Sequence, residues 1–545
     1  MWPGRGRRRV GVALRFAALT ACALGFTCAY GQSAGEQALP GPSPLERQLV
    51  PAKFRLGAVA IRGATVIPES DIQAVLAPFI GQLVGAEELH EIVRRIDALY
   101  DARGFVGSRA HLADQNVSNG TVRIDVIELR VSRVEVAGTL WNRANYVSLA
   151  TWPSSSEVVS LPKVQERLAG LKETGLFERI DADLRLASPG DEGAKIHVSV
   201  IETPPLWIGL SAANDRPPSI GAIRRQLELV DRSLLGWGDA IDVKLGKTNG
   251  LNDSDIGYVF PVVATPISIF AKRTRSDSLA IEPPVFRDLD IVALSDIDAV
   301  GATLALLKSE RLAVSVGASG EKRKTTTTLL GLPFSFTPGL PDQPSYARVA
   351  RGSIEGLWRG EGVSASCRVG YSRGHIEETI PTLDGSGVQP SYHFWQVGLG
   401  GVGRTGAVGE LRFRGEVQIA QQTLPPTERI AIGGATTVRG YRENLLLRDS
   451  GAMGSIEWHW PKAWSWSALT VGGGAFLDGG WARNHTGRSD GLPSAIASVG
   501  IDLEATIWKY VRISTAYAVP NHRNLTPHDD LQDRGFHWGA SISYP

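Results

Sequence analysis

GGATTVRGYRE, the sequence of residues 433–443, lies in a long loop around which the rest of the chain is organised. The segment before it, Leu411–Ala420, alternates apolar and polar residues, and a period of two over that length predicts a strand with one apolar and one polar face. The pair Pro425–Pro426 indicates that the chain leaves the sheet before the quoted stretch begins. An arginine between Val438 and Gly440, in a loop between strands, calls for a physical reason.

The second part of the chain, from Pro204 to the end, has the pattern of a β protein. Helical spacing nearly disappears, and short alternating segments are separated by Gly, Pro, Asn and Asp; examples are Ile241–Leu245, Leu312–Val316, Val363–Tyr371 and Ile501–Ala505. About 340 residues, at about 10 residues per strand plus turns, predict an all-β barrel of about 16 antiparallel strands.

Alternation alone does not distinguish a soluble β-sandwich from a membrane barrel, because both have strands with one apolar face. Three features favour a membrane barrel. The segment is too long for one sandwich. The last strand, Phe536–Tyr544, alternates aromatic residues as the closing strands of outer-membrane barrels do. Tryptophans gather near strand ends, as an interfacial girdle requires, at Trp458, Trp460, Trp464, Trp466 and Trp481.

The N-terminus predicts export. Residues 1–31 combine a basic start with an apolar segment that is short for a membrane span, and they end in small residues that suit a signal peptidase. A lipoprotein cleavage box ending at Cys22 is the less favoured alternative, because Arg15 would leave a very short apolar segment before it. Cleavage near Gly31 would leave Cys367 as the one remaining cysteine, which excludes an internal disulfide.

Two similar α+β units follow a short proline-rich linker, residues 32–53. In the first unit, residues 54–130, strand and helix spacings follow one another in the order β-α-α-β-β. The second unit, residues 131–203, repeats this order with different residues, and its helix is predicted over Leu161–Thr174. The two units form a weak internal repeat with a period of about 75 residues.

These parts together resemble the Omp85 superfamily, and more closely the TpsB transporters of two-partner secretion, the haemolysin secretion/activation proteins of ShlB, FhaC and HecB type. The resemblance covers the chain from about Phe54 to its end. The α+β units are similar to POTRA domains, and residues 204–545 to the family's outer-membrane barrel. The loop near 421–455 matches the family's motif at Val438, Arg439, Gly440 and Tyr441. The linker is too short to supply the helical plug that some members carry.

The resemblance also implies a partner for Arg439. The superfamily pairs its motif arginine with an aspartate on an inward-facing strand, and the matching segment here contains Phe476, Asp478 and Gly479. A guanidinium in a narrow lumen loses hydration and needs a carboxylate, which its planar fork binds through two hydrogen bonds. The alternative is a surface loop with an incidental arginine, where an ion pair would be worth only ~0–1 kcal/mol.

As the resemblance implies, the chain would be an outer-membrane protein with its POTRA-like units in the periplasm. It would export one large TpsA-like exoprotein of haemolysin or adhesin type, and its other partners would be outer-membrane lipid and the machinery that assembles barrels. The strand that contains Ile196, Val198 and Val200 is a candidate edge for capturing the substrate by β-augmentation. The alternatives are an Omp85-type insertase, which shares the motif, and a passive porin, which needs no POTRA-like units.

Nothing in the sequence favours an enzyme, a cofactor, a metal site or nucleic-acid binding. The glycine pattern Gly398–Gly403 is not followed by a helix, so it lacks the context of a dinucleotide site. His90–Arg94 begins like a zinc-protease helix, but Arg94 stands in place of the second histidine. The formal net charge of +1 gives no basic surface for nucleic acid.

Overall fold

The structure, a computed structural model, describes residues 53–545 except 116, 118, 186–192, 283–286, 384–385, 405, 407, 461–463, 487–489, 524, 526–528 and 545. The predicted signal peptide and nearly all of the linker lie outside the described residues. The chain divides into two compact units, Met1–Thr203 and Pro204–Pro545. None of the described helices is long and apolar enough to cross a membrane.

The N-terminal unit begins with a small α+β domain. Its elements are β1 (Phe54–Arg55), β2 (Ala58–Arg62), α1 (Glu69–Leu76), β3 (Leu83–Val84), α2 (Ala86–Ala102), β4 (Arg109–His111) and β5 (Thr121–Ile127). The main sheet has the order β2-β5-β4, with β2 and β5 parallel. The apolar face of α2, which includes Ile92 and Ile96, packs against alternate residues of β5, which include Val122 and Ile124. Apart from the two-residue strands β1 and β3, which pair with each other, this is the β-α-α-β-β order predicted from the sequence.

A second domain of the same kind follows. Its elements are β6 (Val131–Ala137), α3 (Ala144–Thr151), α4 (Leu161–Glu173), β7 (Phe177–Arg185) and β8 (Ala194–Glu202). Helix α3 was not predicted from the sequence. The sheet order is β6-β8-β7, so β8 is the central strand. The prediction that this strand is an edge is therefore wrong.

The predicted substrate-binding residues Ile196, Val198 and Val200 belong to that central strand. Their exposed fractions are 1%, 0% and 5%, so all three are core residues of the domain. Their alternation with polar neighbours correctly indicated a strand with one buried face. Alternation does not indicate whether a strand has one neighbour or two, because edge and central strands can have the same pattern.

The internal repeat extends to single residues. In each domain, a glycine after the first strand of the main sheet lies against the end of the last strand. Gly63 and Gly138 both have positive φ, +81° and +91°, and a Cβ at either would lie 2.2 Å from a carbonyl oxygen of the last strand. Two residues beyond each carbonyl, a glutamate binds the loop that follows the glycine. Glu128 accepts hydrogen bonds from the backbone amides of Thr65 and Val66 at 2.6 and 3.0 Å.

Glu202 has the same role in the second domain. Its carboxylate accepts hydrogen bonds from the backbone amides of Leu140, Trp141 and Asn142 at 2.8, 2.7 and 3.0 Å, and from the Asn142 side chain at 3.0 Å. It is 7% exposed, so water does not replace these bonds easily. The two domains thus share the same arrangement of glycine, carbonyl and glutamate, which indicates that the repeat was predicted at the correct spacing.

Replacing Glu202 by alanine should destabilise the second domain by at least about 2 kcal/mol, because each buried donor left without an acceptor costs about 1–3 kcal/mol. Chemical denaturation followed by tryptophan fluorescence would measure this, since Trp141 and Trp152 lie in this domain. Glu178→Ala, at an exposed position on β7, is the matched control and should change stability little.

The first domain should lose stability in acid through Glu128. Burial raises the pKa of Glu128, but hydrogen bonds from Thr65, Val66 and Tyr100 outweigh burial and hold the pKa below its ordinary value of 4.5. The carboxylate therefore stabilises the folded state above pH 4.5, and this contribution disappears as the pH falls through the lower folded-state pKa. Thermal unfolding of wild type and Glu128→Gln should differ at pH 7 and converge in acid. A difference that persists unchanged at pH 2 would contradict this role.

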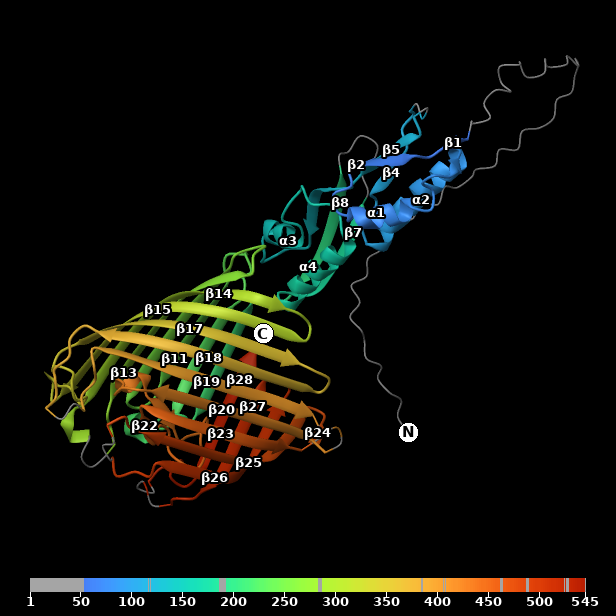
Figure 1. The fold of residues 1–545 in the computed structure, drawn as a ribbon. Helices are drawn as coiled ribbons and strands as arrows, with labels where there is room; N and C mark the ends of the chain where they lie inside the picture. The colour runs from blue at the N-terminus through green and yellow to red at the C-terminus, as the bar shows by residue number, and fades with distance from the viewer. Residues whose placement is uncertain are drawn as a thin grey trace, which may run out of the picture. The chain divides into compact units, whose positions relative to one another are not determined.

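The C-terminal unit is a closed antiparallel barrel (Figure 1). Its sixteen long strands are β9 (Leu206–Ala213), β10 (Arg224–Asp231), β11 (Ala240–Lys247), β12 (Leu251–Pro261), β13 (Ile267–Leu279), β14 (Val292–Lys308), β15 (Leu312–Leu329), β17 (Ser345–Arg359), β18 (Val363–Ile376), β19 (Ser391–Arg404), β20 (Glu410–Ala420), β23 (Ser450–His459), β25 (Leu469–Arg483), β26 (Ala495–Ile507), β27 (Val511–Pro520) and β28 (Phe536–Tyr544). The barrel closes where β28 pairs with β9, from Gly539–Ala213 to Tyr544–Ile208. The predicted fold class is confirmed.

Shorter elements complete the barrel unit. Two short strands, β16 (Leu332–Pro333) and β24 (Trp464–Trp466), extend the wall. The strands β21 (Ile430–Ile432) and β22 (Leu446–Arg448) pair only with each other in the described sheets. The 3-10 helices are η2 (Pro218–Ile220), η3 (Arg287–Leu289) and η4 (Pro426–Glu428).

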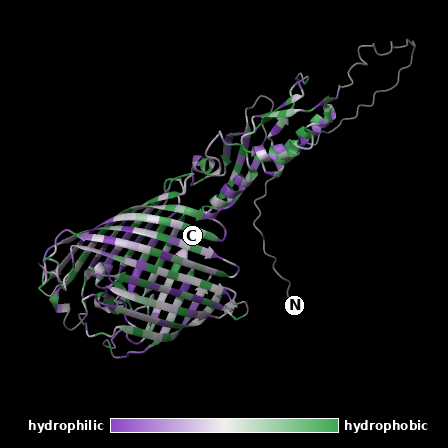
Figure 2. Ribbon diagram, in the orientation of Figure 1, coloured by the Kyte–Doolittle hydropathy of each residue, from purple (hydrophilic) through white to green (hydrophobic). Residues whose placement is uncertain are grey.

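The strands of the barrel have an apolar outer face and a polar inner face, and Figure 2 shows the alternation along them. Large apolar side chains such as Ile354, Leu477 and Val499 are more than half exposed, at 56%, 57% and 56%. A soluble protein would bury such a surface, whereas lipid covers it in a membrane barrel. Exposed tryptophans at the end where the chain enters from Thr203 include Trp358, Trp464 and Trp508, as an interfacial girdle requires.

Candidate functional site

The candidate site is the loop between β20 and β23, which folds back into the barrel. After Ala420 the chain passes through η4 and then forms the β21–β22 hairpin, whose tip is residues 433–445. Gly433 and Gly434 both have φ of +113°, a conformation that side-chain-bearing residues rarely adopt. The hairpin packs through Ile432 and Val438 on Gly480 of β25, where a Cβ would lie 2.5 Å from the Ile432 side chain.

Arg439 at the tip is bound to β25 and β23. Its Nε and Nη2 donate hydrogen bonds to the two carboxylate oxygens of Asp478 at 2.7 and 2.8 Å, and its backbone amide donates to Asp478 Oδ2 at 3.0 Å. Nη2 also lies 3.0 Å from Ser455 Oγ and 2.8 Å from Glu457 Oε1. The guanidinium carbon is 3.3 Å from the centroid of the Phe476 ring. The side chains of Arg439 and Asp478 are 8% and 0% exposed, so this is a buried ion pair.

The other motif residues bind different parts of the barrel. Val438 is fully buried in an apolar cluster with the hairpin strands. Gly440 has φ of +91°, and its amide donates a hydrogen bond to His537 Nε2 of β28 at 3.1 Å. The Tyr441 hydroxyl donates to Asn521 Oδ1, in the loop after β27, at 2.6 Å. The motif thus binds the loop to the last strands of the barrel at several points.

Of the three residues expected beside Arg439, the structure brings two into contact with it. Phe476 and Asp478 face the lumen, at 3% and 1% exposure. Gly479 is the next residue on β25, so its side-chain position is on the opposite face of the strand, and a Cβ there would meet nothing within 4 Å. The glycine that the loop needs for close approach is Gly480.

A second anchor of the loop was not predicted. Arg442 donates hydrogen bonds to both carboxylate oxygens of Asp533 at 2.7 Å, and to Glu282 at 3.0 Å. The Asp533 side chain is fully buried. The sequence signal was an arginine three residues after Arg439, but its two acidic partners lie 91 and 160 residues away in the chain.

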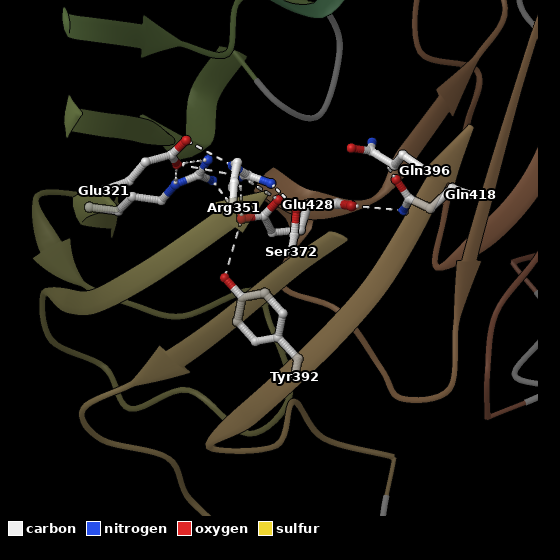
Figure 3. A network of polar contacts seen from close by, with 8 residues as sticks. Glu321, Arg351, Ser372, Tyr392, Gln396, Gln418 and Glu428 are labelled. Atoms are coloured by element: carbon white, nitrogen blue, oxygen red, sulfur yellow. Dashed lines mark hydrogen bonds and ion pairs between the residues drawn. The ribbon is translucent and has the colours of Figure 1, made fainter. Parts of the chain in front are cut away.

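A third anchor, also not predicted, holds the start of the loop to a different part of the wall (Figure 3). Glu428 of η4 accepts two hydrogen bonds from Arg351 of β17, at 2.9 and 3.0 Å, and lies 3.1 Å from Arg323 of β15. The hydroxyl of Tyr392, on β19, donates to Glu428 at 3.2 Å. Glu321 accepts a hydrogen bond from Arg351 at 2.7 Å, so Arg351 lies between two carboxylates. The side chain of Glu428 is 4% exposed.

A polar cavity of about 940 Å³ lies beside this third anchor inside the barrel. Its lining combines the wall, for example Ser353 and Gln396, with the loop, for example Glu428 and Thr436. Displacing the loop would therefore join this cavity to the space that the loop fills. Among the described residues, no group of three or more His, Cys, Asp or Glu side chains could hold a metal ion.

Two protein-family models match the chain. The model described as a ShlB-type POTRA domain matches residues 54–128, and the model of the haemolysin secretion/activation protein ShlB/FhaC/HecB matches residues 391–505, which include the whole loop and its Asp478 partner. An outer membrane transporter, CdiB of Dickeya dadantii, is 20% identical over 508 residues, which cover 90% of this chain and 87% of the relative.

Solved structures show the same fold. CdiB from Escherichia coli superposes with a TM-score of 0.65 at 18% identity, and CdiB from Acinetobacter baumannii with 0.60 at 14%; each covers 94% of both chains. BamA from Haemophilus ducreyi lacking POTRA domains 1–3 superposes with 0.53 at 15% identity, covering 90% of this chain and 100% of that one. The chain therefore contains a ShlB-type POTRA domain and a domain of the haemolysin secretion/activation proteins ShlB/FhaC/HecB, and it shares the fold of CdiB and BamA.

Proposed function

We propose that this chain is the outer-membrane transporter of a two-partner secretion system. It takes one large exoprotein, of haemolysin or adhesin type, from the periplasm and passes it through the barrel lumen to the cell surface. The observation that supports this most strongly is the loop inside the lumen. It is held by ion pairs and side-chain packing, and its strands β21 and β22 pair only with each other in the described sheets, so it can leave without breaking the barrel wall.

The proposed sequence of events begins with export of the chain by its signal peptide, residues 1–31, and insertion of the barrel into outer-membrane lipid by the assembly machinery. The two POTRA domains, residues 54–130 and 131–203, then receive the unfolded exoprotein. In the second domain, β7 has one neighbour in its sheet, so its other side is the proposed edge for strand addition. The periplasm has no ATP, and folding of the exoprotein outside the cell opposes its return.

The two alternatives explain the structure less well. An insertase for other outer-membrane proteins would share the arginine motif, but the matching family model is that of secretion/activation proteins. A passive porin would keep a permanent aqueous channel. Here the lumen contains a loop that is bound at three places, through Arg439, Arg442 and Glu428.

Deleting the gene in its host and comparing culture supernatants tests the proposal. We expect the loss of one very large exoprotein, with other outer-membrane proteins at normal levels. Re-expression of the wild-type chain should restore it. A general fall in outer-membrane proteins would favour the insertase, and an unchanged supernatant and membrane under conditions of expression would rule out secretion as the function.

A further inference from the structure

The outer wall of the barrel carries an uneven distribution of charge at the end away from the chain's entry. Four exposed cations lie there on neighbouring strands of one side: Arg273 on β13, Lys322 on β15, Arg348 on β17 and Arg373 on β18. We call the last three the basic triad. Along each of these three strands, starting from the end where the chain enters, the outward-facing residues are uncharged until the member of the triad is reached.

The sheet register places the basic triad on the outer face. Lys322 pairs with Arg348, and Ala350 pairs with Arg373, and directly paired residues project from the same face of a sheet. Lys322 also pairs with Asp298 of β14, which is two residues from Val300. Val300 is 63% exposed on the apolar outer surface, and residues two apart on a strand share a face. The triad is therefore directed outward, toward lipid, rather than into the lumen.

A shallow groove of about 760 Å³ lies between these cations. Val300 and Ala350 contribute an apolar floor, and Gly320 leaves it open, because a Cβ at Gly320 would meet nothing within 4 Å. Two acidic residues line the groove, Asp298 and Glu321. The Glu321 carboxylate is paired with Arg323 and Arg351, and Arg273 lies 3.6 Å from Asp298. Arg348 is 3.2 Å from Glu377, but both side chains are well exposed, so this pair is readily exchanged for another anion.

Elsewhere at this end of the barrel the exposed residues are mixed. Ile419 on β20, Trp481 on β25 and Tyr517 on β27 are apolar or aromatic, whereas Arg225 on β10, Lys247 on β11 and Arg483 on β25 are cations. A cation is unfavourable against hydrocarbon and favourable at the level of charged headgroups. The basic triad is distinguished from these cations by the groove that all three of its members line.

We propose that the groove binds a phosphorylated glycolipid of the outer leaflet, the chemistry of lipopolysaccharide. Neighbouring strands are about 4.8 Å apart, so the triad, on three successive strands, spans about 10 Å and can hold the phosphates of one headgroup. Arginine binds a phosphate through two hydrogen bonds, and lysine acts as a point charge. The acyl chains then lie on the apolar band that begins at Val300 and Ala350. This site does not depend on the proposed secretion function.

The test is a native mass-spectrometry titration of the full-length protein in detergent with diphosphoryl lipid A. The triple variant Lys322→Gln, Arg348→Gln, Arg373→Gln should bind roughly a hundredfold more weakly than wild type, since each cation near an anionic headgroup contributes about a factor of five. The control variant Arg311→Gln, Arg359→Gln, Lys509→Gln removes the same charge from exposed positions at the other end of the barrel and should bind like wild type.

Three measurements on the wild-type protein need no variant to fold. Dephosphorylated lipid A should bind weakly, and the deacylated diphosphoryl headgroup should also bind weakly. Raising the salt from about 0.05 to about 0.5 M should weaken binding of diphosphoryl lipid A, because exposed charges are screened. Equal binding with and without phosphates, equal binding without acyl chains, or equal loss in the two triple variants would overturn the proposal.

Discussion

Replacing Arg439 by alanine should abolish secretion while leaving the barrel assembled in the outer membrane. Arg439 binds Asp478 and Glu457 inside the lumen, where its side chain is 8% exposed. Removing one partner of a buried ion pair leaves the other charge uncompensated, which costs about 3–5 kcal/mol. The lost ion pair destabilises the position of the loop in the lumen and leaves the barrel wall intact. The wall remains joined there because β23 and β25 pair along a continuous register from Ser450–Arg483 to His459–Gly474.

Two assays separate these effects. Heat-modifiable migration on gels should show a folded barrel for Arg439→Ala, and immunoblots of the supernatant should show at least a tenfold loss of the exoprotein. Arg439→Lys should be intermediate, because an ammonium cannot reproduce the two parallel hydrogen bonds to Asp478. The double variant Arg439→Ala, Asp478→Ala should be less destabilised than the sum of the single variants. Normal secretion by Arg439→Ala would remove the role assigned to the motif.

Replacing Glu428 by glutamine should open the pore without an exoprotein present. The variant keeps the shape of the side chain but removes one of the two carboxylates that compensate Arg351 and Arg323, whose side chains are 23% and 11% exposed. Glu321 remains paired with both arginines, but the charge that attracts them to the start of the loop is lost. A loss of about 1.4 kcal/mol would correspond to a tenfold change in the equilibrium between the seated and displaced loop.

Single-channel recording in planar bilayers would measure the opening directly. Glu428→Gln should spend at least tenfold more time in conducting states than wild type. Glu377→Gln is the matched control, because Glu377 is an exposed carboxylate paired with Arg348 outside the lumen. Closed channels in Glu428→Gln, or equal opening in the control, would show that the third anchor does not hold the loop.

The fold could be predicted because the spacing of apolar residues along each segment depends on the local structure of that segment. Period-two alternation identified the strands, and the helix spacing of Ile92 and Ile96 identified α2, since each pattern depends on which face is buried. The predicted edge at β8 was wrong because strand order depends on pairing between distant segments. The contact between Arg439 and Asp478 was expected from the family resemblance, and composition and spacing alone did not indicate it.

The contacts of Glu428 and Arg442 could not be predicted from the sequence, because they join segments that are distant in the chain. Glu428 meets Arg351 because η4, β15, β17 and β19 come to the same height in the barrel, which depends on the register of every intervening strand. A shift of one residue in any register would turn Arg351 outward. Alternation indicates that the side chains of Arg351 and Arg348 lie on opposite faces of β17, but it does not indicate which of the two faces lipid.

Photocrosslinking from inside the barrel tests the central claim, passage of an exoprotein through the lumen, most directly. A photoreactive residue at Ser353, which lines the polar cavity, would be compared with one at Ile354, the next residue on β17, which is 56% exposed on the outer face. During secretion of an exoprotein stalled by a folded C-terminal fusion, Ser353 should crosslink to the exoprotein and Ile354 should not. Crosslinks from both positions, or from neither while secretion proceeds, would contradict passage through the lumen.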